Sequence, residues 1–168
     1  MGALTAIKKL LDKILIFLSI TFCGAMVVCV SWQVYTRFVR HDPSAVSEEI
    51  ADIMFVWMGL SASALLYGEK GHMNITFLPE KVSFRKKQLL TILSEFFTLF
   101  MAAWVLAYGG YFITLKGMAQ VNAALPWLPI GVIYSIIPIT GVCVVFYAIY
   151  NIIDAARKFV TPLDGGKA

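Results

Sequence analysis

The sequence has few charged residues and lacks the side-chain groupings that build catalytic or metal sites. Only 14% of its 168 residues are Asp, Glu, Lys or Arg, whereas 60% are hydrophobic, a composition outside the range of ordinary soluble domains. It has no Ser, His and Asp constellation, no glycine-rich phosphate loop and no metal-ligand spacing. We therefore expect a membrane protein that is not an enzyme.

Cysteine and histidine are scarce as well. The three cysteines, Cys23, Cys29 and Cys143, all lie in apolar stretches, so we expect neither a disulfide framework nor a zinc or redox site. The two histidines, His41 and His72, fall outside the apolar stretches, whereas a haem held between membrane helices needs an axial ligand within them. The sequence predicts no cofactor and no metal on this chain.

Four apolar stretches are long enough to cross a bilayer as helices. We place them at about residues 14–38, 49–68, 89–115 and 129–153, with a basic loop over about residues 69–88. The remaining connections leave no room for a separate soluble domain. The predicted fold is all-α, with a single membrane domain over residues 1–168 in which four transmembrane helices form a bundle.

Lysine and arginine are distributed unevenly around these spans. Three precede the first span, five lie in the basic loop and three follow the fourth, so eleven of the fourteen fall on one side. The positive-inside rule makes that side cytoplasmic, which predicts a bacterial inner-membrane protein with both termini in the cytoplasm. Arg85, Lys86 and Lys87 are predicted to lie against anionic phospholipid, and basic residues placed beside spans argue against nucleic-acid binding.

Opposite charges meet at the predicted outer ends of the first two spans. Arg37 ends the first span, and Glu48, Glu49 and Asp52 open the second. Residues three or four apart share a helix face, so one arginine can bridge two of these carboxylates. We predict an ion pair that fixes the first hairpin; the alternative is loosely solvated interfacial charge. Ser47 is the predicted N-cap of the second helix.

Glu95 is the acid that the hydropathy pattern places inside a span. Ionisable groups within the membrane are functional candidates by default, and one reading makes Glu95 the proton carrier of a small exporter. The alternative reading is structural, because Glu95 lies near the cytoplasmic end of its helix. There it would pair with Lys70 or Arg85, or extend towards the interface.

Aromatic and small residues predict how the spans sit in lipid and against each other. Trp32, Trp57 and Trp127 are predicted to anchor the outer interface. Three pairs of small residues four apart suit close helix contact: Gly59 and Ser63, Ala103 and Ala107, and Gly131 and Ser135. Pro138 is predicted to kink the fourth span, because it cannot donate a backbone hydrogen bond.

The central third of the chain resembles a known family. The acids Glu48 and Glu49 open an apolar run that contains Gly59, and a glycine-rich exit with Gly71 and His72 follows it. This pattern resembles the small membrane subunit of tripartite ATP-independent periplasmic (TRAP) transporters, the DctQ-like family. The sequence departs from that family at Glu69 and Lys70, where an arginine is common, and at Thr76, where an acid often follows.

The resemblance implies a division of labour between three proteins. In that family a large membrane subunit carries the substrate and sodium sites and moves in an elevator-like way, and a periplasmic binding protein delivers the substrate. The small subunit is then a scaffold that holds the large one, contacts phospholipid and helps to dock the binding protein. Family substrates are organic acids, of which sialic acid is favoured here over a dicarboxylate. The rival reading is a dimeric, proton-coupled multidrug exporter that uses Glu95.

Overall fold

The computed structural model describes residues 2–42, 44–69 and 84–160, and all of its regular elements are helices. Four of these helical segments are long and apolar enough to cross a membrane: Leu4–Arg40, Ala45–Glu69, Ile92–Gly117 and Ile130–Arg157. The four predicted spans and the all-α class are therefore confirmed. Gly71 and His72 of the family pattern, and Lys70, lie outside the described residues.

The first hairpin consists of α1 (Gly2–Tyr35), which continues as the π-helical turn η1 (Thr36–Arg40), and α2 (Ala45–Glu69). The helix starts well before the predicted residue 14, because the basic N-terminal segment is helical as well. It ends at His41, which adopts a left-handed conformation with a φ of 53°. Ser44 caps α2, since its Oγ accepts a hydrogen bond from the Ser47 amide at 3.4 Å; the prediction of Ser47 as the cap was wrong by one turn.

The second hairpin is less regular. One continuous helical rod contains α3 (Phe84–Met101), the π-helix η3 (Ala102–Gly109) and α4 (Gly110–Gly117). The return rod contains α5 (Ile130–Tyr134) and α6 (Ile136–Val160). The break between them at Ser135 lies one turn before Pro138, where the missing N–H and the proline ring disturb the helix as predicted.

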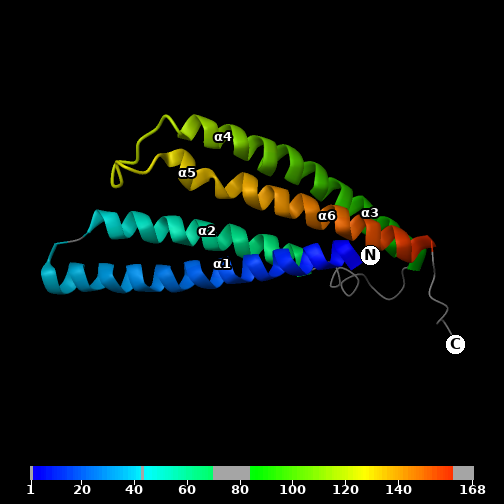
Figure 1. The fold of residues 1–168 in the computed structure, drawn as a ribbon, viewed down its shortest axis with the longest axis horizontal. Coiled ribbons are helices and arrows are strands. Elements are labelled where there is room, and N and C mark those ends of the chain that lie inside the picture. Colours follow the sequence, from blue (N-terminus) through cyan, green and yellow to red (C-terminus); the bar gives the residue numbers. More distant parts are fainter. Residues whose placement is uncertain (1, 43, 70–83, 161–168) are drawn as a thin grey trace.

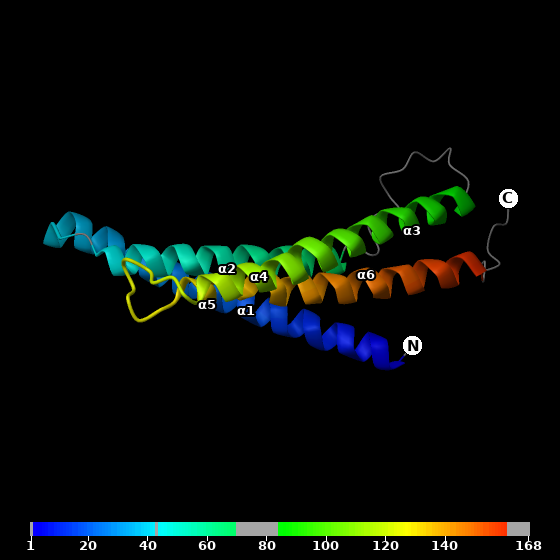
Figure 2. The same cartoon turned by 90° about the horizontal axis from the view of Figure 1, so that it is seen from above.

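The four rods lie side by side as an open row rather than around a closed centre. Along this row α1 packs on α2, α2 on α6, and α6 on α3 and η3 (Figure 1). Seen from above, their middle parts form a thin layer, while α3 and the start of α1 diverge at one end (Figure 2). Both ends of the described chain lie at that end of the row, and the turn after η1 and the loop over residues 118–129 lie at the other (Figure 1).

Glycines let the two rods of the second hairpin touch. A Cβ on Gly131 would lie 2.4 Å from the Thr114 carbonyl oxygen and 2.5 Å from the Met118 amide nitrogen, and Gly117 faces the backbone of Gly131. This confirms Gly131 as a contact residue. Gly59 is different, because a Cβ there meets nothing within 4 Å, and Ala103 is exposed while its neighbour Ala102 is buried. The pair at Gly59 therefore does not pack within this chain.

Candidate functional site

Glu95 joins three helices at one buried point. Its carboxylate on α3 accepts hydrogen bonds from the Tyr67 hydroxyl of α2 and, at 3.3 Å, from the Asn151 side-chain amide of α6. Only 3% of Glu95 is exposed, so it does not extend to the interface. In lipid such interhelical hydrogen bonds stabilise association where water cannot drive it. The arrangement makes Glu95 a cross-link between the two hairpins.

The surroundings of Glu95 help to choose between its two predicted roles, a proton carrier and a structural group. Lys70 and the side chain of Arg85, the proposed basic partners, lie outside the described part of the structure. An apolar cavity of about 280 Å³ lies next to Tyr67, and its lining includes Leu60, Thr98 and Thr140 but not Glu95. A buried carboxylate with two internal donors is a satisfied structural group, and this supports the structural reading over a proton carrier.

A second polar link ties α1 to α6 near the same end of the row. The Tyr147 hydroxyl donates to Asp12 Oδ1 at 2.6 Å, and Lys8 Nζ lies 4.0 Å from Asp12 Oδ2. Tyr147 is fully buried, and its ring fills the space beside Gly68, where a Cβ would come within 2.7 Å of the ring. Sequence reasoning missed this link, because neither Tyr147 nor Asp12 stands out in the pattern.

Trp57 lies at the midpoint of α2 rather than at the outer interface, where an anchor was predicted. Its indole Nε1–H donates to the Ile133 carbonyl of α5 at 2.9 Å. Its ring meets Phe22 of α1 edge to face, with centroids 5.4 Å apart. Trp57 thus cross-links α1, α2 and α5 inside the layer.

At the end of the row opposite the termini of the described chain, Glu49 contacts the 118–129 loop instead of Arg37. Asn122 donates its side-chain N–H to Glu49 Oε1 at 2.6 Å, while Asn122 Oδ1 accepts from the amides of the second and third residues that follow it. Arg37, Glu48 and Asp52 are exposed. Within the described chain no salt bridge joins Arg37 to these acids, so the predicted ion pair is not formed in this structure.

The physical reason lies in the two chain segments that meet there. Arg37 falls in the exposed π-helical turn η1, whereas the loop folds Asn122 back onto α2. Asn side chains often stabilise a turn by accepting hydrogen bonds from backbone amides a few residues further along. The presence of Asn122 in this loop was therefore the available sequence signal for the turn. A cavity of about 250 Å³ at this end is lined by residues that include Glu49, Asp52, Asn122 and Tyr134, and we call it the acidic recess.

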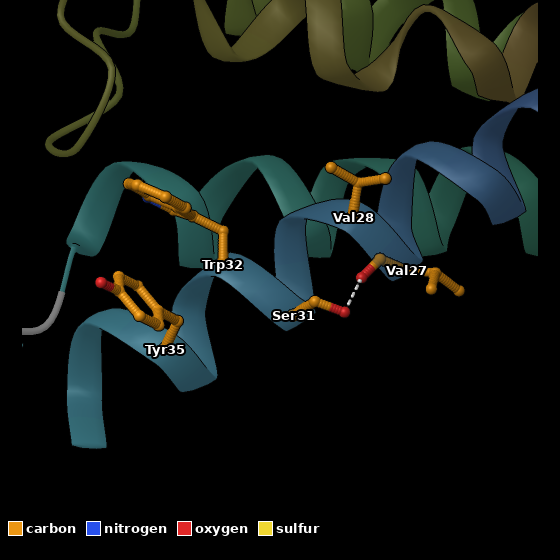
Figure 3. Close-up of a pocket in the computed structure, with 5 residues that line it drawn as sticks. All are labelled: Val27, Val28, Ser31, Trp32 and Tyr35. Atoms are coloured by element: carbon orange, nitrogen blue, oxygen red, sulfur yellow. Dashed lines mark hydrogen bonds between the residues drawn. The ribbon is translucent and has the colours of Figure 1, made fainter. Parts of the chain in front are cut away.

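Of the other predicted anchors, Trp32 and Trp127 are both well exposed, at 50% and 72%. Trp32 and Tyr35 lie with centroids 5.7 Å apart and border a shallow apolar depression of about 480 Å³ on α1 (Figure 3). The side chains of Arg85, Lys86 and Lys87 lie outside the described part, so their predicted contact with phospholipid stays a prediction.

One exposed feature was not anticipated. Phe100, Trp104 and Tyr108 form a ladder of rings along α3 and η3, with successive centroids 6.3 and 5.7 Å apart. We call these three residues the aromatic ladder. The four-residue spacing of these rings is visible in the sequence, but the sequence analysis predicted roles only for aromatic residues near the membrane interface.

Comparison with known proteins identifies the family. The family model described as tripartite ATP-independent periplasmic transporters, DctQ component, matches residues 26–158. The chain belongs to this DctQ family. The match runs from residue 26, in the first helical rod, to residue 158, in the fourth, and it confirms the resemblance inferred from the acids that open α2 and the glycine-rich exit that follows it.

Two curated relatives align with most of the chain. The chain is 28% identical over 158 residues to the sialic acid TRAP transporter small permease protein SiaQ of Vibrio cholerae serotype O1, with 92% of this chain and 88% of the relative aligned. It is 22% identical over 142 residues to a putative TRAP transporter small permease protein of Haemophilus influenzae, with 83% and 85% aligned. The DctQ chain described here is therefore a multi-pass small permease subunit of a TRAP transporter.

Proposed function

We propose that this DctQ subunit is a scaffold that holds the large elevator-type transport subunit in the bacterial inner membrane. The observation that supports this most is that polar side chains within the spans form hydrogen bonds between helices. Glu95, Tyr67 and Asn151 satisfy one another between helices, and Trp57 uses a backbone carbonyl of α5. Polar side chains used in this way stiffen a helix row, which suits a supporting subunit.

The other components then carry the transport chemistry. Sodium and substrate bind to the large subunit, and a periplasmic protein delivers the substrate to it. The outer end of this chain helps to dock that protein, through the 118–129 loop that Asn122 holds against Glu49 and through the acidic recess beside it. The excess of basic residues at the opposite end supports a cytoplasmic location for both termini.

The proposed substrate is an organic acid, and sialic acid is favoured over a dicarboxylate. Support comes from the name of the Vibrio cholerae relative, aligned over 92% of this chain. Substrate choice belongs to the large subunit and the binding protein in this proposal. A change of substrate class would therefore leave the scaffold role intact.

Reconstitution of the transporter in proteoliposomes tests this function. With an inward sodium gradient, we expect uptake of labelled sialic acid when all three components are present, and loss of uptake when this chain is left out. Glu95→Gln should retain most of the uptake, because the amide oxygen still accepts from Tyr67. Proton-coupled drug movement by this chain alone, abolished by Glu95→Gln, would overturn the scaffold role in favour of an exporter.

A further inference from the structure

The aromatic ladder runs along the free edge of the helix row. Phe100, Trp104 and Tyr108 are 58%, 64% and 64% exposed, while the opposite side of the same rod packs on α5 and α6. The rings of Phe100 and Trp104 are nearly parallel, with 11° between their planes. The ladder thus presents one continuous strip of ring surface away from the rest of the chain.

The π-helix η3 keeps this strip straight. In an α-helix, a four-residue step overshoots one full turn by about 40°, so every fourth residue drifts around the rod. A π-helix has more residues in each turn, so a four-residue step covers slightly less than one full turn. The drift then runs in the opposite direction around the rod. Because η3 spans Ala102–Gly109, Trp104 and Tyr108 stay in line with Phe100. Single π-helical turns occur frequently at functional sites.

The ladder carries polar groups at a depth where lipid offers no partner for them. Trp104 lies at the midpoint of the span Ile92–Gly117, and Tyr108 is about 6 Å further along the axis. The hydrocarbon core extends about 15 Å to each side of its centre, and acyl chains contain no hydrogen-bond acceptors. Within the described residues, neither the Trp104 N–H nor the Tyr108 O–H donates a hydrogen bond.

Three comparable side chains on α2 and α6 are paired inside the chain. The indole of Trp57, at the midpoint of α2, donates to Ile133, and the hydroxyls of Tyr67 and Tyr147 donate to carboxylates. Tryptophan and tyrosine exposed to lipid concentrate at the interfaces, where their polar tips reach water or head groups. Trp104 and Tyr108 are neither paired within the described part of the chain nor placed at an interface. An acceptor supplied by another protein would satisfy their donors.

We propose that the aromatic ladder is the surface on which a transmembrane helix of the large transport subunit docks, with backbone or side-chain oxygens placed to accept from Trp104 and Tyr108. The inference rests on the proposed function, because that function supplies a membrane partner of this kind. A second copy of this chain and lipid alone are the competing occupants of the strip.

Photo-crosslinking in membranes that contain the whole transporter tests the assignment. p-Benzoylphenylalanine replaces Trp104 or Tyr108, and Phe17 on the far edge of the row, 68% exposed, serves as the matched site. We expect an adduct with the mass of this chain plus the large subunit from Trp104 and Tyr108, and none from Phe17. Adducts only between two copies of this chain, adducts with lipid alone, or heteromeric adducts only from Phe17 each overturn the docking face.

A second measurement separates this inference from the proposed function. Trp104→Phe and Tyr108→Phe keep the ring and remove the donor, so we expect each to lower co-purification of the large subunit roughly three- to tenfold, in line with interhelical hydrogen bonds in membranes. Trp32→Phe makes the same change on α1 and should have no effect. If the unaltered chain does not retain the large subunit, the proposed function fails; if retention is normal in both ladder variants, only the docking face fails.

Discussion

At the scale of single residues, Gly68 of α2 packs directly against the ring of Tyr147 on α6. The Tyr147 ring lies where a side chain at this position would begin, and its hydroxyl is fixed by Asp12 on α1. The ring therefore cannot move aside without breaking this partly buried hydrogen bond. A glycine here lets one tyrosine connect three helices.

We expect Gly68→Ala to destabilise the subunit by about 1–3 kcal/mol, the usual cost of overpacking a well-packed site. The reason is the 2.7 Å separation between the added Cβ and the Tyr147 ring. The measurement is the thermal unfolding midpoint of the purified chain in mild detergent. Gly59→Ala is the matched control on the same helix, because its Cβ meets nothing within 4 Å; equal midpoints for the two variants would contradict the packing argument.

The residues of the polar network were only partly predictable from the sequence. Glu95 could be found because a carboxylate within an apolar stretch is conspicuous. Its partners Tyr67 and Asn151 could not, since which faces of α2 and α6 turn towards α3 depends on helix rotation and neighbour order. For the same reason, charge spacing alone predicted that Arg37 pairs with Glu49, whereas in the structure Glu49 accepts a hydrogen bond from Asn122.

At the scale of elements, hydropathy located the four spans but not their irregular parts. Apolar composition and length decide whether a segment can cross lipid, so each span was found with boundaries off by a few residues, except at the start of α1. The π-helical segments leave no comparable trace: η3 is as apolar as the adjoining α-helices, and the two arginines of η1 mark the end of the first span but not its π-helical geometry. Pro138 is the exception, since its missing N–H marks the break at Ser135 directly.

In the loop over residues 118–129, the side chain of Asn122 makes the hydrogen bond to α2. Asn122→Ala removes the hydrogen bond to Glu49 and two bonds to loop amides. We expect the free energy of local opening of this loop to fall by about 1–3 kcal/mol, since one of the lost bonds involves a charged group. Hydrogen exchange of the loop amides measures this change.

Glu49→Gln is the control for that loop variant. It keeps an acceptor oxygen for Asn122 and leaves both bonds within the loop intact, so exchange should accelerate less than in Asn122→Ala. Exchange in α2 and α6 should stay unchanged in both variants. Unaltered loop exchange in Asn122→Ala would show that the loop is held by other contacts.

At the scale of the whole molecule, the open row gives the subunit two different edges. The α1 edge is mainly aliphatic and carries the apolar depression beside Trp32 and Tyr35 (Figure 3). The α3 edge carries the aromatic ladder. A flat layer buries little of its own surface, with at most 28% of any span's most apolar window enclosed. In the proposed scaffold role, such a flat layer would extend the width of the large subunit in the membrane more than a closed bundle of the same length.

The orientation of that layer in the membrane follows from its charges and is directly testable. The native cysteines are first removed by Cys23→Ala, Cys29→Ala and Cys143→Ala. Single cysteines are then introduced by Asp42→Cys or Ala123→Cys at one end of the row, and by Lys9→Cys or Arg157→Cys at the other. In the sequence, eleven of the fourteen basic residues fall on the side of the spans to which Lys9 and Arg157 belong, and the positive-inside rule retains that side in the cytoplasm. A membrane-impermeant maleimide added to spheroplasts should therefore label the first two positions strongly and the last two only after lysis. The reverse pattern would turn the subunit over, and would place its basic loop, rather than the acidic recess beside Glu49, against the periplasmic binding protein.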